Sequence, residues 1–229
     1  RSIDEKLKID TVEELVRDTK WPSGIQVHRR STNRGVGYSV PEACDEFFVT
    51  RSSGIILEDD CVPTQEFFRL AEGGLKSYQQ DHRVALVSGN CIATPPKGQM
   101  GRLVPEPTLR LSRYPLLWGW ATWRDRWQNY RLILANWRRQ VPLHTLAWRL
   151  GSVVAANDWR KLFDASSAAP PLSWDYQVAH MMLARNQFSV TPSIDLVENV
   201  GYGHDASNTQ STPSYSPKVP TQHAREEWW

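Results

Sequence analysis

The chain has 229 residues, of which 40% are hydrophobic and 23% are charged, and its formal net charge is +2. This length and composition allow one large domain with a sizeable core, and the small charge gives no electrostatic case for binding nucleic acid or a membrane surface. No apolar stretch of the sequence reaches the roughly 18 residues needed to span a bilayer. The three cysteines follow no metal-binding spacing, so a reducing, cytoplasmic location is expected.

The first half of the sequence alternates predicted helices with short apolar strands. Hydrophobic residues at helical spacing, together with capping residues, predict helices over residues 4–19, Pro41–Val49 and Thr64–Gln79. Short apolar runs between them predict strands over Ile25–His28, Ile55–Glu58 and Val84–Ser88. Such alternation is typical of an α/β fold in which helices flank a mostly parallel sheet.

The second half begins with residues 92–108, which are rich in Pro and Gly and predict a surface loop or mobile lid. Further helices and strands are predicted after it. The helices are Trp118–Tyr130, Leu143–Leu150, Val153–Phe163 and Asp175–Asn186, and the strands are Phe188–Val190 and Ile194–Val197. Proline, serine and threonine then predict an extended tail over residues 211–229.

The tetrapeptide Glu58-Asp59-Asp60-Cys61 directly follows the apolar run Gly54–Leu57. Three acidic side chains at the exit of a short buried strand repel one another and resist desolvation, so a divalent cation is the expected partner. Ser88-Gly89-Asn90 also falls at a strand end, where ligands gather in α/β sheets. The alternative is structural, because Asp59 and Asp60 would then cap the helix that begins near Thr64.

Five segments of the chain carry a family resemblance. They are Asn33–Gly37, Gly54–Pro63 with Phe67-Phe68, Ser88–Asn90, Tyr114–Arg124 and Ser173–Gln177. In this order they resemble the nucleotide-sugar-dependent glycosyltransferases of the GT-A fold, in a bacterial subgroup, and the resemblance covers residues 3–209. It implies a single GT-A domain over residues 1–210, with a Rossmann-like mixed but mostly parallel sheet flanked by helices. Members usually begin with one further strand, which the resemblance implies is missing from this sequence.

The resemblance also implies a metal-dependent chemistry. A nucleoside diphosphate leaves with negative charge, and Mg²⁺ or Mn²⁺ bound to both phosphates neutralises that charge as a Lewis acid. Asp60 is expected to bind the metal directly, and His204 is the imidazole available as a second ligand. Asp59 is expected to face the ribose or to reach the metal through water, while Glu58 anchors the turn.

The base and the nucleotide contacts are predicted in the same way. An inverting transfer needs a carboxylate that takes the proton of the acceptor hydroxyl, and Asp175 matches the family position for this base. Helix capping is its alternative role. Arg30, Asn33 and Arg34 are expected near the nucleotide, with an exposed polar turn as the alternative, and Asn90 is expected to contact the donor.

Tryptophan is the unusual residue, with eleven in the chain and four in the segment Trp118–Trp127. If this segment is helical, Trp120, Trp123 and Trp127 share one face, which favours a core role. Trp118 is then the better platform for an acceptor sugar, although core packing is its alternative, and Gly119 would let the backbone approach the donor sugar. His180 is expected to be a packed or surface histidine rather than a ligand.

These residues predict a metal-dependent hexosyl- or N-acetylhexosaminyltransferase. The donor would be a nucleotide sugar, UDP-linked first of all, and the acceptor a saccharide or lipid-linked saccharide. Two alternatives stay open. One is a catalytically impaired transferase or a carbohydrate-binding protein, whose sugar affinity would survive a chelator. The other is a metal-dependent phosphotransferase or hydrolase, which should show further metal ligands or a phosphate-cradling loop.

Overall fold

The computed structural model describes residues 3–20, 22–91, 108–167 and 173–201. The chain forms two compact units, Arg1–Asn33 and Arg34–Trp229. The predicted loop over residues 92–107 and the tail over residues 211–229 lie outside the described residues, as does His204. None of the described helices is both long and apolar enough to cross a membrane.

The first unit contains helix α1 (Ile3–Asp18) followed by extended chain. The helix predicted over residues 4–19 is confirmed, and Arg29 of the extended chain pairs with Glu13 of this helix. The strand predicted at Ile25–His28 is wrong. A strand exists only where its backbone groups pair with another strand, and the described part of this unit offers only a helix.

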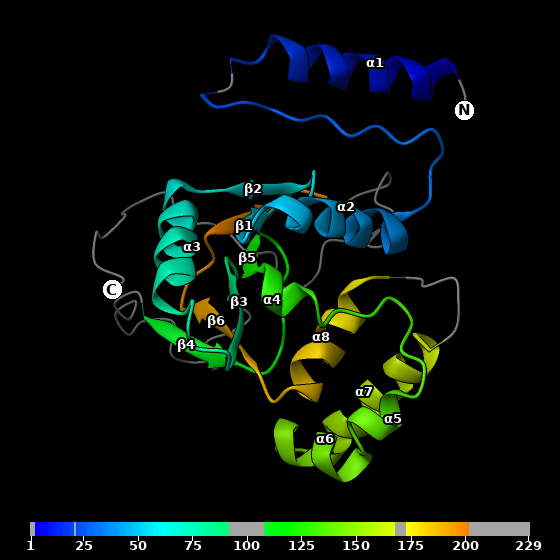
Figure 1. Ribbon diagram of the computed structural model, residues 1–229, viewed down its shortest axis with the longest axis vertical. Helices are drawn as coiled ribbons and strands as arrows, with labels where there is room; N and C mark the ends of the chain where they lie inside the picture. Colours follow the sequence, from blue (N-terminus) through cyan, green and yellow to red (C-terminus); the bar gives the residue numbers. More distant parts are fainter. Residues whose placement is uncertain (1–2, 21, 92–107, 168–172, 202–229) are drawn as a thin grey trace, which may run out of the picture. The chain divides into compact units, whose positions relative to one another are not determined.

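The second unit is built on a five-stranded sheet with the order β1-β5-β3-β6-β4 (Figure 1). Its strands are β1 (Ser53–Ile56), β3 (Val84–Ser88), β4 (Leu109–Ser112), β5 (Trp120–Trp123) and β6 (Phe188–Pro192). Only the β3–β6 pair is parallel among the four pairings of this sheet in the described residues. The fold is therefore mixed α/β, and the prediction of a mostly parallel sheet is wrong.

The sheet was predicted to be mostly parallel because the sequence did not reveal strand β5. The three strands of this sheet that the sequence predicts, β1, β3 and β6, do run in one direction. Strand β5 is antiparallel to both β1 and β3, and β6 is parallel to β3. The sequence predicted a helix over Trp118–Tyr130, whereas only α4 (Arg124–Trp127) is helical there. All four side chains of β5 are at most 3% exposed, so the alternation that reveals a strand is absent, and its aromatic and β-branched residues favour the strand.

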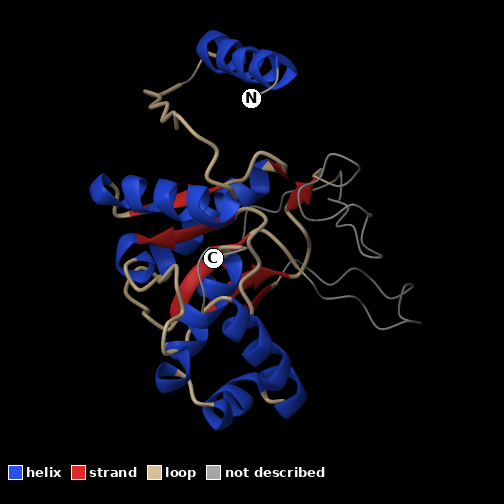
Figure 2. Ribbon diagram, turned by 90° about the vertical axis from the view of Figure 1, so that its right-hand side faces the viewer, coloured by secondary structure: helices blue, strands red, loops and turns tan. Residues whose placement is uncertain are grey.

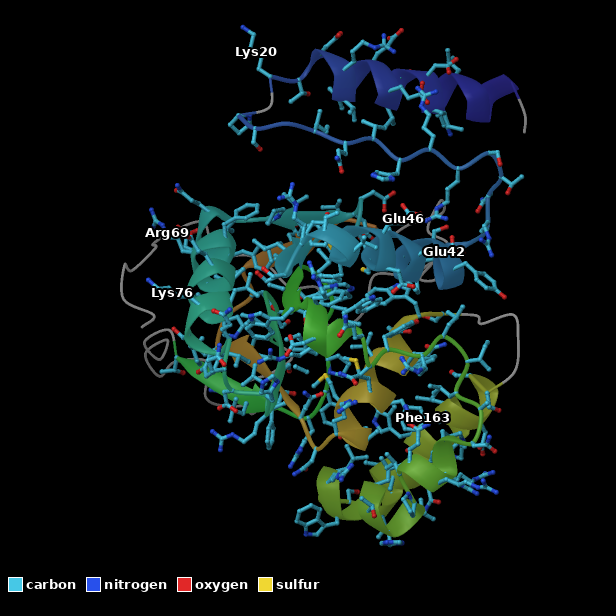
Figure 3. All side chains as sticks on the ribbon, viewed as in Figure 1. Lys20, Glu42, Glu46, Arg69, Lys76 and Phe163 are labelled. Carbon is cyan, nitrogen blue, oxygen red and sulfur yellow. The ribbon has the colours of Figure 1, made fainter. Side chains whose placement is uncertain are left out.

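Helices cover both faces of the sheet (Figure 2). Helix α3 (Gln65–Ser77) packs Phe67 and Leu70 on one face, in a cluster with Trp123. Its polar side chains, such as the labelled Arg69 and Lys76, project away from the sheet (Figure 3). The helix runs from N-cap Thr64 as predicted, since the Thr64 hydroxyl accepts the Phe67 N–H at 3.3 Å.

The opposite face is covered by α2 (Val36–Thr50), α4 and α8 (Asp175–Ala184). Trp120 lies in this second cluster because successive strand residues alternate between faces, so Trp120 and Trp123 point to opposite sides. Both are core residues, as predicted. Helix α2 begins at Val36, earlier than the predicted Pro41, directly after Gly35 in a positive-φ conformation (φ 73°).

A helical module follows the sheet strands β4 and β5. It consists of α5 (Trp137–Gln140), α6 (Leu143–Leu150) and α7 (Val153–Ala165), and it packs against α8 around Phe163 (Figure 3). The predictions for α6, α7 and α8 are confirmed. His180 of α8 is 3% exposed and meets the Phe163 ring edge to face at 5.3 Å, so it is the packed histidine expected.

Candidate functional site

The acidic tetrapeptide forms a tight turn directly after β1. The Cys61 N–H donates to the Glu58 carbonyl at 3.1 Å, which places Asp59 and Asp60 at the two central positions of the turn. Strand β2 (Cys61–Pro63) starts there and pairs antiparallel with β7 (Val197–Asn199). Thr64 caps α3 instead of either aspartate, so the capping alternative for these aspartates is wrong.

The segment after β7 closes over Asp60. The Val200 N–H donates to the Asp60 carbonyl at 2.8 Å, and the Gly201 N–H donates to Asn199 Oδ1 at 2.9 Å. A Cβ placed on Gly201 would lie only 2.2 Å from Asp60 Oδ2. The bare backbone of Gly201 therefore packs against the carboxylate of Asp60, and residues with side chains do not fit there without displacing it.

Asp175 is brought to the same end of the sheet by a stack of indoles. Trp120 is paired with Ile56, two residues before Glu58, and its ring stacks on that of Trp174 with centroids 5.8 Å apart. Asp175 follows Trp174 as the first residue of α8, and the Ser173 hydroxyl donates to its carboxylate. The N-cap position of α8 is held by Trp174, so Asp175 is not the N-cap residue. A negative charge in the first turn still stabilises a helix, because it interacts favourably with the helix dipole.

The shifted pKa values of this region also indicate that the acidic turn and Asp175 lie close together. Burial raises the pKa of Glu58 to about 7, with further increments from the charges of Asp60, Asp59 and Asp175. Burial, followed by the nearby Cys44 and by Asp175, also raises the pKa of Tyr130. Carboxylates from two distant parts of the chain therefore share one poorly solvated region, where a cation would relieve their repulsion.

The thiols of this region are structural. Burial is the main reason that the pKa values of Cys44 and Cys61 rise to about 12. Both thiols therefore stay protonated at neutral pH when no cation is bound, and a protonated thiol is a poor nucleophile. The carboxylate oxygens of the acidic turn are the hard donors that Mg²⁺ and Mn²⁺ prefer.

Whether a metal ion fits the acidic turn depends on how many donor side chains lie close together. No three His, Cys, Asp or Glu side chains are close enough to hold a metal within the described ranges, so these residues do not build a closed all-protein site. Mg²⁺ and Mn²⁺ suit oxygen ligands, and Mg²⁺ is commonly held by one or two carboxylates together with substrate phosphates and water. The turn containing Asp60 fits such an open site, and His204 stays a prediction.

The end of β3 contacts the same region, but the side chain of Asn90 there is buried. Asn90 is 3% exposed and donates through Nδ2 to the Val197 carbonyl at 3.3 Å, while its Oδ1 is buried and has no partner in the part of the chain that the structure describes. Asp195 Oδ1 accepts the N–H of Cys91 at 2.7 Å. These contacts fasten the segment before β7 to the end of β3, and they engage the amide nitrogen of Asn90, but not its Oδ1, with the protein's own backbone.

Glycine at position 119 is required by neighbouring side chains. Its φ is +69°, and a Cβ there would lie 2.7 Å from Val197 Cγ2 and 3.2 Å from Leu57 Cδ2. Packing against these side chains therefore gives Gly119 a structural reason of its own, and the contact with the donor sugar stays a prediction. Trp118 is half-buried against the cluster that contains Phe67, which fits the core alternative for this residue.

The predicted nucleotide contacts are divided between the two units. Arg30 and Asn33 belong to the first unit and Arg34 to the second. The Arg34 guanidinium lies 2.5 Å from Glu42 and 5.0 Å from the Tyr38 ring centroid, at the start of α2. Its side chain remains 47% exposed, so it can still meet a ligand.

Sequence reasoning missed the contacts that shape the site. Neither the place of Gly201 against Asp60 nor its hydrogen bond to Asn199 has a signal in the sequence. Arg126, which the sequence places next to the tryptophans, is 2% exposed and donates to the carbonyls of Tyr78 and Gln79 at the end of α3. It is a structural anchor.

Comparison of the chain with protein-family models gives no match, and comparison with curated proteins gives no significant match. The chemistry must therefore be read from the arrangement itself. Carboxylates at the carboxyl end of β1 face the first turn of α8, in the part of an α/β sheet where ligands usually bind. Such a site can hold a hydrated cation on one side and a proton-accepting carboxylate on the other.

Proposed function

We propose that this protein is a metal-dependent glycosyltransferase of the GT-A type. It would move a hexosyl or N-acetylhexosaminyl group from a nucleotide-sugar donor, UDP-linked first of all, to a saccharide or lipid-linked acceptor. The observation that carries the proposal is the convergence of the turn Glu58–Asp60 with Asp175 at one end of the sheet. The resemblance of the surrounding segments to GT-A transferases supports it.

The acidic turn would bind the donor. Asp60 would hold Mg²⁺ or Mn²⁺, with water and the predicted ligand His204, and the bound ion would neutralise the charge of the leaving diphosphate. Asp59 is exposed at its turn position and can accept hydrogen bonds from a ribose. The backbone of Gly201 limits where the Asp60 carboxylate can move, which favours one orientation for binding.

Asp175 would serve as the base of an inverting transfer. One of its oxygens is occupied by the Ser173 hydroxyl, which orients the carboxylate. The carboxylate accepts the proton of the acceptor hydroxyl, the acceptor oxygen bonds to the anomeric carbon, and the bond from that carbon to the diphosphate oxygen breaks. The proton ends on Asp175 and the electron pair on the leaving nucleotide.

Substitution of the two aspartates separates these roles. Wild-type protein should be stabilised against heat by a UDP-sugar only when Mn²⁺ or Mg²⁺ is present. Asp60→Asn should lose this metal-dependent stabilisation. Asp175→Asn should keep it while transfer or donor hydrolysis falls by about 100-fold or more.

Asp158→Asn is the matched control, because Asp158 is an exposed carboxylate on α7 paired with Lys161. It should behave as wild type in both measurements. If no nucleotide sugar stabilised the wild-type protein with either metal, the proposed function would be wrong.

A further inference from the structure

The turn between α6 and α7 carries three exposed apolar side chains. Trp148 is 73% exposed, Val153 64% and Val154 73%. They lie within one tight turn, because Gly151 reverses the chain in a positive-φ conformation (φ 65°) and its N–H donates to the Trp148 carbonyl at 3.3 Å. We call Trp148, Val153 and Val154 the apolar tip.

The exposure of Trp148 is unusual for this protein. Five other tryptophans of the described residues are at most 3% exposed, namely Trp120, Trp123, Trp127, Trp137 and Trp174. A single exposed hydrophobic side chain needs no explanation, because folded proteins have many. An indole and two valines that are exposed side by side instead indicate a surface that contacts something apolar.

The apolar tip points away from the core of the second unit. Helices α6 and α7 lie on the side of α8 away from the sheet (Figures 1 and 2). Their shared inner face contains Leu146 and Ala156, which are fully buried in one cluster. Trp148 and Val154 are each two residues from one of these, roughly 200° around the helix axis. Both therefore lie on the outer face.

The helical module that carries the tip is basic. Its residues 137–165 contain five basic and two acidic side chains, a net charge of +3, whereas the whole chain has +2. The two carboxylates are already paired, Asp158 with Lys161 and Asp164 with Arg138. Three arginines remain in excess, and they are Arg139, Arg149 and Arg160. The small charge of the whole chain therefore hides a region that complements an anionic surface.

The surface of an anionic lipid bilayer matches both properties of this region. Tryptophan prefers the boundary between water and hydrocarbon, and basic side chains are attracted to anionic headgroups within about a Debye length. A second copy of the chain fits less well. Three side chains expose less than the roughly 800 Å² per partner that a stable protein interface buries, and two copies would bring their basic modules together.

We propose that the apolar tip docks on the surface of a bilayer that contains anionic lipid. Trp148, Val153 and Val154 enter the boundary between headgroups and acyl chains, and the surplus arginines of the module face the lipid phosphates. The contact is peripheral and reversible, because three side chains bury little apolar area. It does not depend on the proposed function.

Co-sedimentation of the whole chain with vesicles tests this docking. Vesicles of phosphatidylcholine are compared with vesicles that also contain phosphatidylglycerol, at low and at high salt. The protein should bind the anionic vesicles about tenfold or more tightly, and salt should weaken this binding. Trp148→Ala should weaken it by about fivefold or more, because one large apolar side chain no longer enters the boundary.

Matched variants separate the tip from the rest of the surface. Phe68→Ala removes an aromatic ring that is 43% exposed on α3, and it should bind as wild type does. Arg139→Glu should weaken binding to the anionic vesicles. Arg69→Glu makes the same change of charge on α3, where Arg69 projects away from the sheet, and it should weaken binding far less (Figure 3).

The outcomes against the docking are distinct. Binding to neither kind of vesicle, equal binding to both, or equal binding of wild type and Trp148→Ala would each overturn it. Sedimentation velocity without lipid should show a monomer, and a dimer that Trp148→Ala breaks would assign the tip to contact between copies. Stabilisation by a UDP-sugar should be unchanged in Trp148→Ala, so this test and that of the proposed function can fail separately.

Discussion

At the scale of single residues, the contact between Gly201 and Asp60 has the most direct consequence. Gly201 is the point at which the chain passes over the carboxylate, and its N–H is held by Asn199 Oδ1 at 2.9 Å. Because a Cβ at this position would come within 2.2 Å of Asp60 Oδ2, even the smallest side chain must push the carboxylate aside or displace the backbone.

Gly201→Ala should therefore lower the affinity for Mn²⁺ by about 10- to 100-fold, the range seen when groups that orient metal ligands are altered. Isothermal titration with MnCl₂ in the presence of UDP measures this directly. Gly24→Ala is the control, since nothing among the described residues lies within 4 Å of a Cβ built there. An unchanged affinity in Gly201→Ala would mean that Asp60 does not hold the metal.

At the scale of secondary-structure elements, Thr64 connects β2, which it directly follows, with α3 and β7. Its hydroxyl accepts the Phe67 N–H at the start of α3 and donates to the Leu196 carbonyl at 3.0 Å. Its own N–H donates to the same carbonyl at 2.9 Å. Leu196 directly precedes β7, so this cap also fixes the strand that pairs beside the acidic turn.

Thr64→Ala should lower the free energy of unfolding by about 1–2 kcal/mol, because it removes a helix cap and a hydrogen bond to Leu196. Urea denaturation followed by circular dichroism measures the change. Thr64→Ser should retain most of the stability, since serine keeps the hydroxyl. Thr11→Ala removes an exposed hydroxyl bonded to Leu7 within α1, and a loss as large as that of Thr64→Ala would refute the capping explanation.

At the scale of the whole second unit, α8 joins two hydrophobic clusters. Val178 and Met182 pack against the sheet, whereas Ala179 and Leu183 pack into the helical module. Residues 177–183 of α8 are all buried, as expected for a helix that is covered on every side. His180 lies in the middle of it, so its protonation affects the joint between the sheet and the module.

The buried His180 makes stability depend on pH. Burial lowers its pKa from 6.5 to about 4, against a smaller opposing effect of a hydrogen bond to the Trp137 backbone. Between these pH values the unfolded chain takes up a proton that the folded protein refuses, so the free energy of unfolding falls as pH falls from 6.5 to 4. The shift corresponds to a loss of about 3 kcal/mol.

Denaturation at several pH values measures this effect. His180→Gln should flatten the dependence of the free energy of unfolding on pH in that window. His144→Gln, on the exposed side of α6, is the control and should follow the wild-type curve. A His180→Gln curve parallel to that of wild type would show that His180 is not the group responsible.

Several elements could be predicted because their signals are local. The helix after Thr64 was predicted from a cap within four residues of its first hydrogen bond, and Val84–Ser88 from one uninterrupted apolar run. Trp120–Trp123 could not be assigned in this way, because a strand buried on both faces has no alternation. Ile25–His28 has the pattern of a strand but finds no pairing partner in the described part of its unit.

In the candidate site, too, features with a local signal could be predicted and features that depend on distant contacts could not. Asp60 was predicted from residue type and position, since acidic groups at a strand end are readable along the chain, whereas Asp175 was predicted from the resemblance to GT-A transferases. The packing of Gly119 against Val197 could not be predicted, because nothing near Gly119 in sequence reveals this neighbour. The ring contacts among Tyr114, Trp159 and Tyr176 join three separate segments, so no local pattern indicates them.

By itself, the sequence determined the acidic turn, the helix caps and most helices, because these depend on interactions between residues a few positions apart. Only the tertiary structure decided the direction of the strands and the packing of Gly201 on Asp60. These features depend on contacts between distant segments, and such contacts are set by how the apolar faces of the sheet and helices are buried together.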